Sequence, residues 1–325
     1  MGMWYIKKMK KEEELTQNIN LPRIFKKIVI KIKKIFSLLT IIEKDNKMIV
    51  IIPERDSEKI SEKKLEKYAK KINNHMYDKT NQILVLENKL QSETFKNLLY
   101  ANNCKILEGR WLFSFLLPKV LEYISEKQEI QSKNIEIAIL INDNREKALK
   151  TIIQLAKEVR MINIVTCDID KFRKLEEYLY ETMGIVVRIT NNRKKALLKS
   201  NIIFNYDFPE EMLNQYIIPK KAVVVSLPGK IKIYTKRFSG INANFYRVLL
   251  PEKYRIWFES NNIYNEFNKA ILYESVLYQK NSYESIVKEI EENKSKILCL
   301  IGNNGEIQEQ EYKFHNNFTQ AHLTK

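Results

Sequence analysis

The sequence predicts an α/β protein built on parallel β-sheets. Short apolar runs alternate with segments that have helical periodicity along most of the chain. From residue 135 onward the runs are nearly continuous in apolar residues, as in strands that are buried on both faces. With only 7 Gly and 7 Pro, the connections are expected to be short and polar. Right-handed crossovers between such strands would place helices over the sheet.

Composition narrows the class further. A chain of 325 residues with 44% hydrophobic and 30% charged residues is typical of a soluble globular protein with about two domains. We find no signal peptide and no apolar run of transmembrane length, so a cytoplasmic location is expected. The cysteines and histidines are too dispersed for a disulfide framework or a zinc site, so no metal is predicted. They are Cys104, Cys167, Cys299, His75, His315 and His322.

The net charge of +16 raises the question of nucleic-acid binding. Lysine, asparagine and isoleucine are abundant along the whole chain, however, and the lysines mostly fall between apolar positions. That pattern is typical of solvated surfaces, so nucleic acid is disfavoured as a partner.

Residues 1–47 form a basic amphipathic N-terminal segment, with no acidic residue between Leu15 and Ile42. Residues 22–36 have apolar side chains every three or four positions, which predicts a helix. We expect this helix to pack on the domain with a lysine-rich outer face. Contact with an anionic membrane surface through 22–36 is a disfavoured alternative, as is a partial strand. The apolar positions are Leu21, Phe25, Ile28, Ile32, Ile35 and Leu39.

Residues 48–134 are predicted to form a small α/β domain. A polar turn at 43–47 separates two apolar runs and predicts a hairpin or two adjacent strands. The polar stretch 125–134 is the expected boundary to the next domain. One strand, 38–42, is predicted before this domain. Within it the predicted strands are 48–52, 83–86 and 105–107, and the predicted helices are 57–77, 92–100 and 111–124.

Residues 135–235 are predicted to form a second domain of alternating strands and helices. Gly184 follows the second helix, where a left-handed C-cap is expected. The expected strands are 135–141, 162–166, 185–189, 201–205 and 222–227, with an exposed strand at 231–234. The expected helices are 145–160, 169–183, 192–199 and 209–216.

Residues 236–307 are predicted to supply C-terminal helices and a strand, with one long helix at 253–279 and another at 283–293. The strand 297–301 leads into a glycine-asparagine turn at 302–305. No Lys-Ser or Lys-Thr follows this turn, so we interpret it as a hairpin and not as a phosphate loop. Residues 308–325 are predicted to be a frayed tail.

Ligands of such sheets bind at the carboxyl ends of the strands, where the strand order reverses. Polar residues follow every predicted strand of the second domain, and Asp168 stands where an acidic residue would bind a ribose. Asp168, Asp143 or Asn144 could instead cap the helices that follow them. The predicted cofactor-binding residues are Asn142, Asp143, Asn144, Asp168 and Asn205.

The run from Ser200 to Pro209 is similar to the segment after the fourth strand in the shikimate dehydrogenase and glutamyl-tRNA reductase group. This resemblance implies a Rossmann-like domain, with Asn205 close to the nicotinamide of NAD or NADP. The chain departs from the group in three places. The Gly-x-Gly-x-x-Gly turn reads Asn142-Asp143-Asn144, Tyr206 and Asp207 replace Ala-Thr, and the motif that carries the catalytic lysine is absent.

We therefore expect a repurposed Rossmann-like protein, non-catalytic or regulatory, that binds a small molecule or nucleotide in an interdomain cleft. A protein partner is a further option. The alternative is an NAD(P)-dependent oxidoreductase of the shikimate dehydrogenase type, and the second alternative is a basic protein that binds nucleic acid or a membrane surface. No catalytic residue is assigned, because Cys167 is the one thiol at a strand end and Asp168 beside it would raise its pKa.

Overall fold

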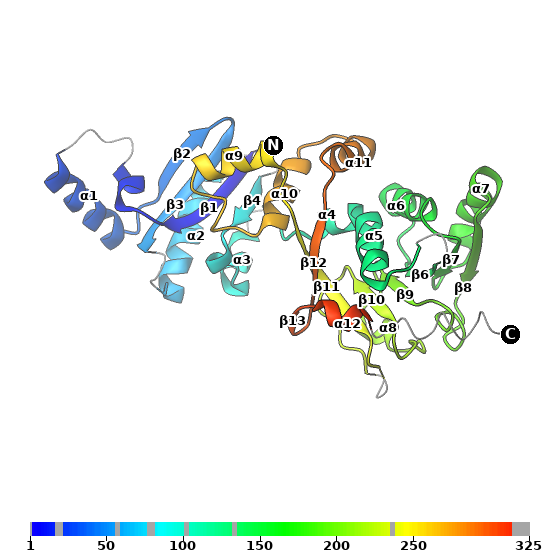
Figure 1. Cartoon of the computed structure of the whole chain (residues 1–325). Helices are drawn as coiled ribbons and strands as arrows, with labels where there is room; N and C mark the ends of the chain where they lie inside the picture. The colour runs from blue at the N-terminus through cyan, green and yellow to red at the C-terminus, as the bar shows by residue number, and fades with distance from the viewer. Residues whose placement is uncertain are drawn as a thin grey trace. The chain divides into compact units, whose positions relative to one another are not determined.

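The computed structural model describes residues 2–16, 22–55, 59–76, 82–100, 104–131, 135–234 and 238–313 (Figure 1). The chain divides into two units, each with its own sheet. Unit 1 comprises Met1–Gly109 and Leu250–Gln279, and unit 2 comprises Arg110–Leu249 and Lys280–Lys325. Both sheets are mainly parallel and are joined to helices, so the predicted α/β class is confirmed. Within the described ranges, no helix is long and apolar enough to cross a membrane.

Unit 1 is built on a five-stranded sheet in the order β2-β3-β1-β4-β5. All neighbouring strands are parallel except β2 and β3, which form the predicted hairpin. Its turn contains Asp45 and Asn46 with positive φ, which these two residue types tolerate. The strands are β1 (Met3–Met9), β2 (Thr40–Lys44), β3 (Lys47–Arg55), β4 (Ile83–Leu86) and β5 (Lys105–Ile106).

The central strand β1 was not predicted from the sequence. Every one of its residues is buried, including Lys7 and Lys8. Lys7 is accommodated because its ammonium pairs with Glu14 of the following 3-10 helix, η1 (Glu12–Thr16), at 3.1 Å. The lysines break the apolar run that otherwise indicates a buried strand, which explains the missed element.

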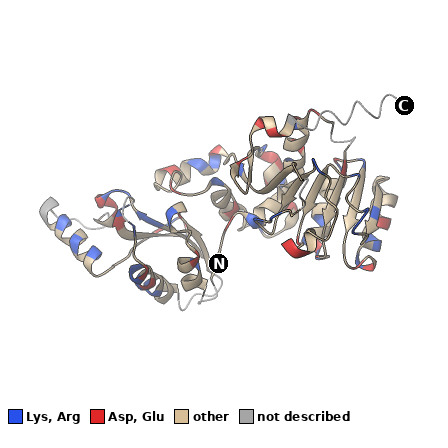
Figure 2. Ribbon diagram, turned by 90° about the horizontal axis from the view of Figure 1, so that it is seen from below, with Lys and Arg blue, Asp and Glu red and all other residues tan. Residues whose placement is uncertain are grey.

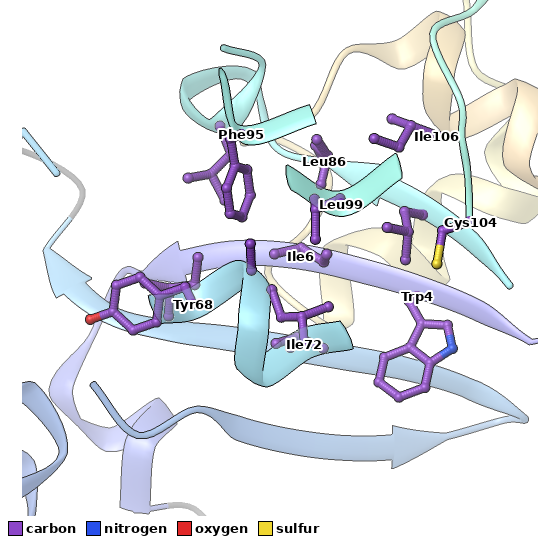
Figure 3. Close-up of a cluster of buried hydrophobic side chains, with 14 of the residues drawn as sticks. Trp4, Ile6, Tyr68, Ile72, Leu86, Phe95, Leu99, Cys104 and Ile106 are labelled. Carbon is purple, nitrogen blue, oxygen red and sulfur yellow. The ribbon is translucent and has the colours of Figure 1, made fainter. Parts of the chain in front are cut away.

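One face of this sheet is covered by helices α2 (Glu62–Met76) and α3 (Glu93–Tyr100). Trp4 and Ile6 of β1 belong to the same buried cluster as Tyr68 and Ile72 of α2 and Phe95 of α3 (Figure 3). Alternation along β1 sends these two side chains to one face and Tyr5 to the other. The cluster is the apolar core on this side of unit 1.

On the opposite face, Tyr5 packs against aromatic residues from the second stretch of unit 1. Its ring lies 5.6 Å from that of Trp257 and 5.8 Å from that of Phe258, and its hydroxyl is 2.9 Å from the hydroxyl of Ser275. These residues belong to α9 (Glu252–Ser260) and α10 (Lys269–Leu277). The prediction of one helix over 253–279 is therefore wrong, because the chain leaves helical geometry after Ser260 and restarts where Asn268 caps α10.

Helix α1 (Arg23–Ile35) confirms the predicted helix but not its orientation. Ile30 is buried, whereas Phe25, Ile28, Ile32 and Ile35 are exposed. Lys27 and Lys31 are exposed as expected, but the expectation that the apolar stripe packs on the domain is wrong. The amphipathic periodicity was correct, but it does not say which face of a helix the rest of the fold covers.

Unit 2 is built on an eight-stranded sheet in the order β13-β12-β11-β10-β9-β6-β7-β8. From β8 to β11 all neighbours are parallel, whereas β12 and β13 are antiparallel additions. Counted from β6, the parallel strands have the order 3-2-1-4-5-6 of a Rossmann-like sheet. The strands are β6 (Glu136–Leu140), β7 (Met161–Val165), β8 (Val186–Thr190), β9 (Ile202–Asn205), β10 (Val223–Ser226), β11 (Ile241–Val248), β12 (Ile297–Gly302) and β13 (Gly305–Glu306).

The helices of unit 2 follow the prediction in part. Gly184 ends α7 in the left-handed conformation, as expected. The predicted helix 192–199 is wrong, since this segment forms turns from which Ala196 and Leu197 pack under the sheet. The helices are α4 (Arg110–Phe115), α5 (Leu117–Gln128), α6 (Glu146–Ala156), α7 (Arg173–Met183), α8 (Glu210–Leu213), α11 (Tyr283–Glu292) and α12 (Glu309–Lys313), with 3-10 helices η2 (Asn88–Leu90, in unit 1) and η4 (Asp170–Phe172).

The C-terminal part brings two further corrections. The exposed strand predicted at 231–234 is absent, and β11 instead pairs with β10. Residues 309–313 of the predicted frayed tail form α12, in which Tyr312 is fully buried, while 314–325 lie outside the described residues. The hairpin at 302–305 is confirmed, with Gly305, the first residue of β13, at φ +116°.

Candidate functional site

The candidate site lies at the carboxyl ends of β6 and β9, where the strand order of unit 2 reverses. In the parallel pairing of these strands, Leu140 stands opposite Asn205. The loops that follow both strands therefore leave the same edge of the sheet next to each other. In Rossmann-like proteins this is where the pyrophosphate of a dinucleotide binds.

The loop after β6 adopts its conformation without glycine. None of residues 142–145 has a positive φ. Its backbone donors point to a carboxylate of the same unit: the N–H of Asn142 donates to both carboxylate oxygens of Asp207, at 2.9 and 3.0 Å, and the N–H of Asp143 donates to Oδ2 at 2.6 Å. An anion thus already occupies the loop, and it is supplied by the protein itself.

Asp207 is half-buried, and its environment combines opposing effects. Burial raises the pKa of this carboxyl, and the nearby negative charge of Asp143 acts in the same direction. The two backbone donors and Arg145 lower it, so they favour the ionised form. Burial is the largest of these effects, and the pKa of Asp207 lies above its ordinary value.

Asn142 links the loops after β6 and β7. Its side-chain oxygen accepts hydrogen bonds from the hydroxyl of Thr166 at 3.2 Å and from the N–H of Cys167 at 2.9 Å. Thr166 is fully buried, so this bond fixes the amide of Asn142 against the sheet. The side chain therefore has a structural role in the described loops, in addition to its predicted place in a ligand site.

Asp143 forms an ion pair with Arg145, with Nη2 and Oδ2 2.7 Å apart. The guanidinium hydrogen bonds lower the pKa of Asp143. Helix α6 has Arg145 as its N-cap without a side-chain capping bond, so the alternative that Asp143 or Asn144 caps this helix is wrong. Asn144 is exposed beside them.

Asp168 lies after β7 and forms an ion pair with Lys171 at 3.3 Å. Its N–H donates to the hydroxyl of Thr166 at 3.3 Å. Helix α7 begins at Arg173 with Phe172 as N-cap, so the alternative role of Asp168 as a helix cap is wrong. The ribose-binding role remains a prediction.

Asn205 is fully buried and uses its amide to hold the next turn. Its Oδ1 accepts from the N–H of Phe208 at 2.9 Å, and its Nδ2 donates to the carbonyl of Phe208 at 2.9 Å and to the hydroxyl of Ser226 at 3.2 Å. This amide braces the turn that carries Asp207. Its predicted place beside a nicotinamide is not tested by these contacts.

Among the described residues, this edge has no general acid that is hydrogen-bonded to a general base. Burial raises the pKa of Tyr206 to about 12, so its phenol is neutral at physiological pH. Cys167 is exposed, with its sulfur 3.8 Å from that of Met212. In the described part of unit 2 there is no histidine, and the described residues contain no cluster that could hold a metal ion.

The structure thus brings together Asn142, Asp143 and Asp207 directly, and links Asn142 through Thr166 to Asp168. The sequence pointed to all of these strand ends, but it did not indicate that Asp207 would turn towards the loop after β6. The one feature of the sequence that sets Asp207 apart is its position two residues after Asn205, where the resembling group carries a threonine.

Comparisons with known proteins give no family. No family model matches the sequence, and no curated protein matches it. Among solved structures, L-tryptophan dehydrogenase from Nostoc punctiforme is similar at 9% identity and a TM-score of 0.31, over 90% of this chain and 79% of that chain. Aspartate transcarbamoylase from Trypanosoma cruzi is similar at 11% identity and a TM-score of 0.30, over 86% of this chain and 82% of that chain.

Proposed function

We propose that this chain is a non-catalytic binding protein whose Rossmann-like unit serves as a scaffold and does not hold a dinucleotide in the usual way. The observation that carries the proposal is the carboxylate of Asp207 on the backbone donors of Asn142 and Asp143. In a dinucleotide-binding protein those donors are the groups that receive the pyrophosphate.

A free pyrophosphate would have to displace a carboxylate that is tethered to the same unit. A tethered group competes at a high effective concentration, because it loses little translational freedom on binding. The phosphate would also approach two carboxylates, Asp143 and Asp207, with the exposed Arg145 already paired to the first. Both effects disfavour an anionic ligand at this loop.

The groups left at this edge suggest the class of ligand. The described carboxylates of Asp143, Asp168 and Asp207 accept hydrogen bonds and carry negative charge. We therefore infer a small polar ligand without phosphate, neutral or cationic, in place of NAD or NADP. The absence of a base with a positioned partner in the described part of this edge supports binding over catalysis.

The test is a titration of the full chain with NADH and with NADPH, followed by nicotinamide fluorescence at physiological salt. We expect no saturable signal from the unaltered protein. Asp207→Ala removes the tethered anion, and with it a negative charge that repels pyrophosphate. This variant should therefore bind ADP, a pyrophosphate probe, about tenfold more tightly than the unaltered chain. Glu177→Ala, which removes an exposed carboxylate from α7 instead, is the matched control and should not change ADP affinity.

The competing function is the NAD(P)-dependent oxidoreductase suggested by the sequence resemblance. The strand order 3-2-1-4-5-6 in unit 2 is compatible with it. Saturable enhancement of nicotinamide fluorescence by the unaltered protein, at micromolar concentrations of cofactor, would contradict our proposal in favour of that enzyme.

A further inference from the structure

Helix α1 carries a concentrated exposed apolar surface. Of the sixteen large apolar side chains that are exposed among the described residues, six lie within residues 25–38. They are Phe25, Ile28, Ile32, Ile35, Phe36 and Leu38, each between 41% and 65% exposed. Those in the helix recur every three or four residues, so they form one stripe along a single face, which we call the α1 stripe.

The α1 stripe faces outward because the helix is held by its other side. Ile30, which falls between the stripe positions, is buried. Lys33 donates from Nζ to the carbonyl of Leu15 at 2.8 Å and to the hydroxyl of Thr40 at 2.7 Å. These contacts attach α1 to its own unit through the side that does not contain the stripe.

The charged residues that border the α1 stripe on the helix are all basic. Lys27 and Lys31 are exposed on the helix, and neither forms an ion pair within the described ranges. The sequence has no acidic residue between Leu15 and Ile42. Figure 2 shows α1 with basic residues only among its charged positions. An apolar stripe bordered by lysines is the pattern of a helix that lies in the interface of an anionic membrane.

We propose that α1 binds the surface of an anionic membrane, with the α1 stripe in the acyl boundary and its lysines at the lipid phosphates. The sequence alone disfavoured this contact, because the apolar face of the helix was expected to pack on the domain. The helix has 13 residues and is about 20 Å long, too short for a hydrocarbon core of about 30 Å, so it lies in the membrane plane. The proposal is independent of the ligand inferred for unit 2.

Two other occupants fit the helix less well. A nucleic acid would neutralise the lysines but would leave Phe25, Ile28 and Ile32 without an apolar environment. Pairing of the α1 stripe with that of a second copy would bury these side chains, but it would bring two sets of lysines together. An anionic membrane satisfies the apolar residues and the charges at once.

The experiment is flotation of the full chain with vesicles at physiological salt. One set of vesicles contains phosphatidylcholine and phosphatidylserine in a ratio of about 7:3, and the other contains phosphatidylcholine only. Ile28→Gln with Ile32→Gln removes part of the stripe, and Lys27→Gln with Lys31→Gln removes charge. All four side chains are exposed, so both double variants should fold like the unaltered chain, which circular dichroism verifies.

Matched controls remove equivalent groups elsewhere. Tyr178→Gln with Tyr180→Gln removes two exposed apolar side chains from α7, and Lys63→Gln with Lys67→Gln removes two exposed lysines from α2. Each lysine near an anionic surface contributes about a fivefold gain in partitioning, so the loss of Lys27 and Lys31 should weaken binding at least about tenfold. We expect a similar loss for the isoleucine variant, and no loss for either control.

Three results would overturn the proposal. The first is that the unaltered chain does not float with the phosphatidylserine vesicles, or floats equally after both α1 variants. The second is tight binding of a 20-base-pair duplex at the same salt that the isoleucine variant leaves unchanged, which would assign α1 to nucleic acid. The third is a dimer in light scattering that the isoleucine variant abolishes while vesicle binding is absent, which would assign the α1 stripe to a second copy.

Discussion

Asp207 allows the interpretation of unit 2 to be tested through stability. Asp207→Ala removes the acceptor of three short contacts, from the N–H of Asn142 at 2.9 and 3.0 Å and from the N–H of Asp143 at 2.6 Å. Removing a charged acceptor typically costs about 1.5–3 kcal/mol. Asp207 is half-buried, so water can replace part of the lost contact, and relief of its burial and of repulsion from Asp143 offsets more. We expect the free energy of unfolding to fall by about 1–2 kcal/mol in Asp207→Ala.

For a unit of this size, a loss of that magnitude lowers the unfolding temperature by about 2–8 °C. Thermal unfolding followed by circular dichroism measures it, with Asp207→Asn as the control. The amide oxygen of asparagine can still accept from the loop, so its loss should be less than half that of alanine. An unfolding temperature unchanged in Asp207→Ala would refute the conclusion that this carboxylate holds the loop after β6.

The pH dependence gives a second readout of the same group. Burial raises the pKa of Asp207 above 3.8 in the folded protein. A carboxyl with a raised folded pKa binds its proton more tightly in the folded state, so its contribution to stability is present below 3.8 and is lost as pH rises through the folded pKa. The stability of Asp207→Asn relative to the unaltered protein should therefore increase over this window. A difference that is flat with pH would show that the pKa of Asp207 is not raised.

Three further substitutions test the structure elsewhere in unit 2, each by urea unfolding. Asn205→Ala leaves three buried hydrogen-bonding groups without a partner, so it should lower the free energy of unfolding by about 2–4 kcal/mol. Asn144→Ala, at an exposed position, should lower it by less than about 0.5 kcal/mol. Equal effects of the two substitutions would contradict the role of Asn205 in bracing its turn. Gly240→Ala places a Cβ against the carbonyl of Ala222, which cannot move without shifting β10, so a loss of at least about 2 kcal/mol is expected and a neutral effect would be inconsistent with this approach. Tyr312→Ala removes a fully buried ring from α12 and should cost about 3 kcal/mol, while no change would support the frayed tail that the sequence predicted.

Strands β6, β7, β9 and β10 of unit 2 were predictable because they are buried on both faces. Segments such as 137–141 and 222–225 are unbroken apolar runs, and the polar residues that follow them mark the loops. Strand β11 was missed because Asn242, Asn244 and Arg247 interrupt its pattern, although most of its residues are buried. Buried polar residues in strands depend on partners that are far away in the sequence, and Asn244, for example, donates to Asn303 at 2.8 Å. The local pattern of apolar and polar residues does not reveal such partners.

The site was predictable in its position but not in its internal contacts. The rule that ligands bind where strand order reverses selected Asn142, Asp143 and the turn after Asn205. That rule concerns the backbone. Which carboxylate accepts from which N–H is decided by side-chain direction after the two loops have been brought together, so the sequence could not predict that Asp207 occupies the donors of its neighbouring loop.

The missing glycines and the presence of Asp207 belong to one arrangement. Glycine in this loop normally allows the backbone to approach an external pyrophosphate. Here the anion is a side chain on a turn that Asn205 holds through both the N–H and the carbonyl of Phe208, so Asp207 is positioned from both ends of its turn. Glycines introduced at Asn142 and Asp143 would widen the space but would leave the donors occupied. The absence of glycine and the presence of the internal carboxylate are therefore two parts of one arrangement, in which Asp207 accepts the hydrogen bonds of the loop after β6.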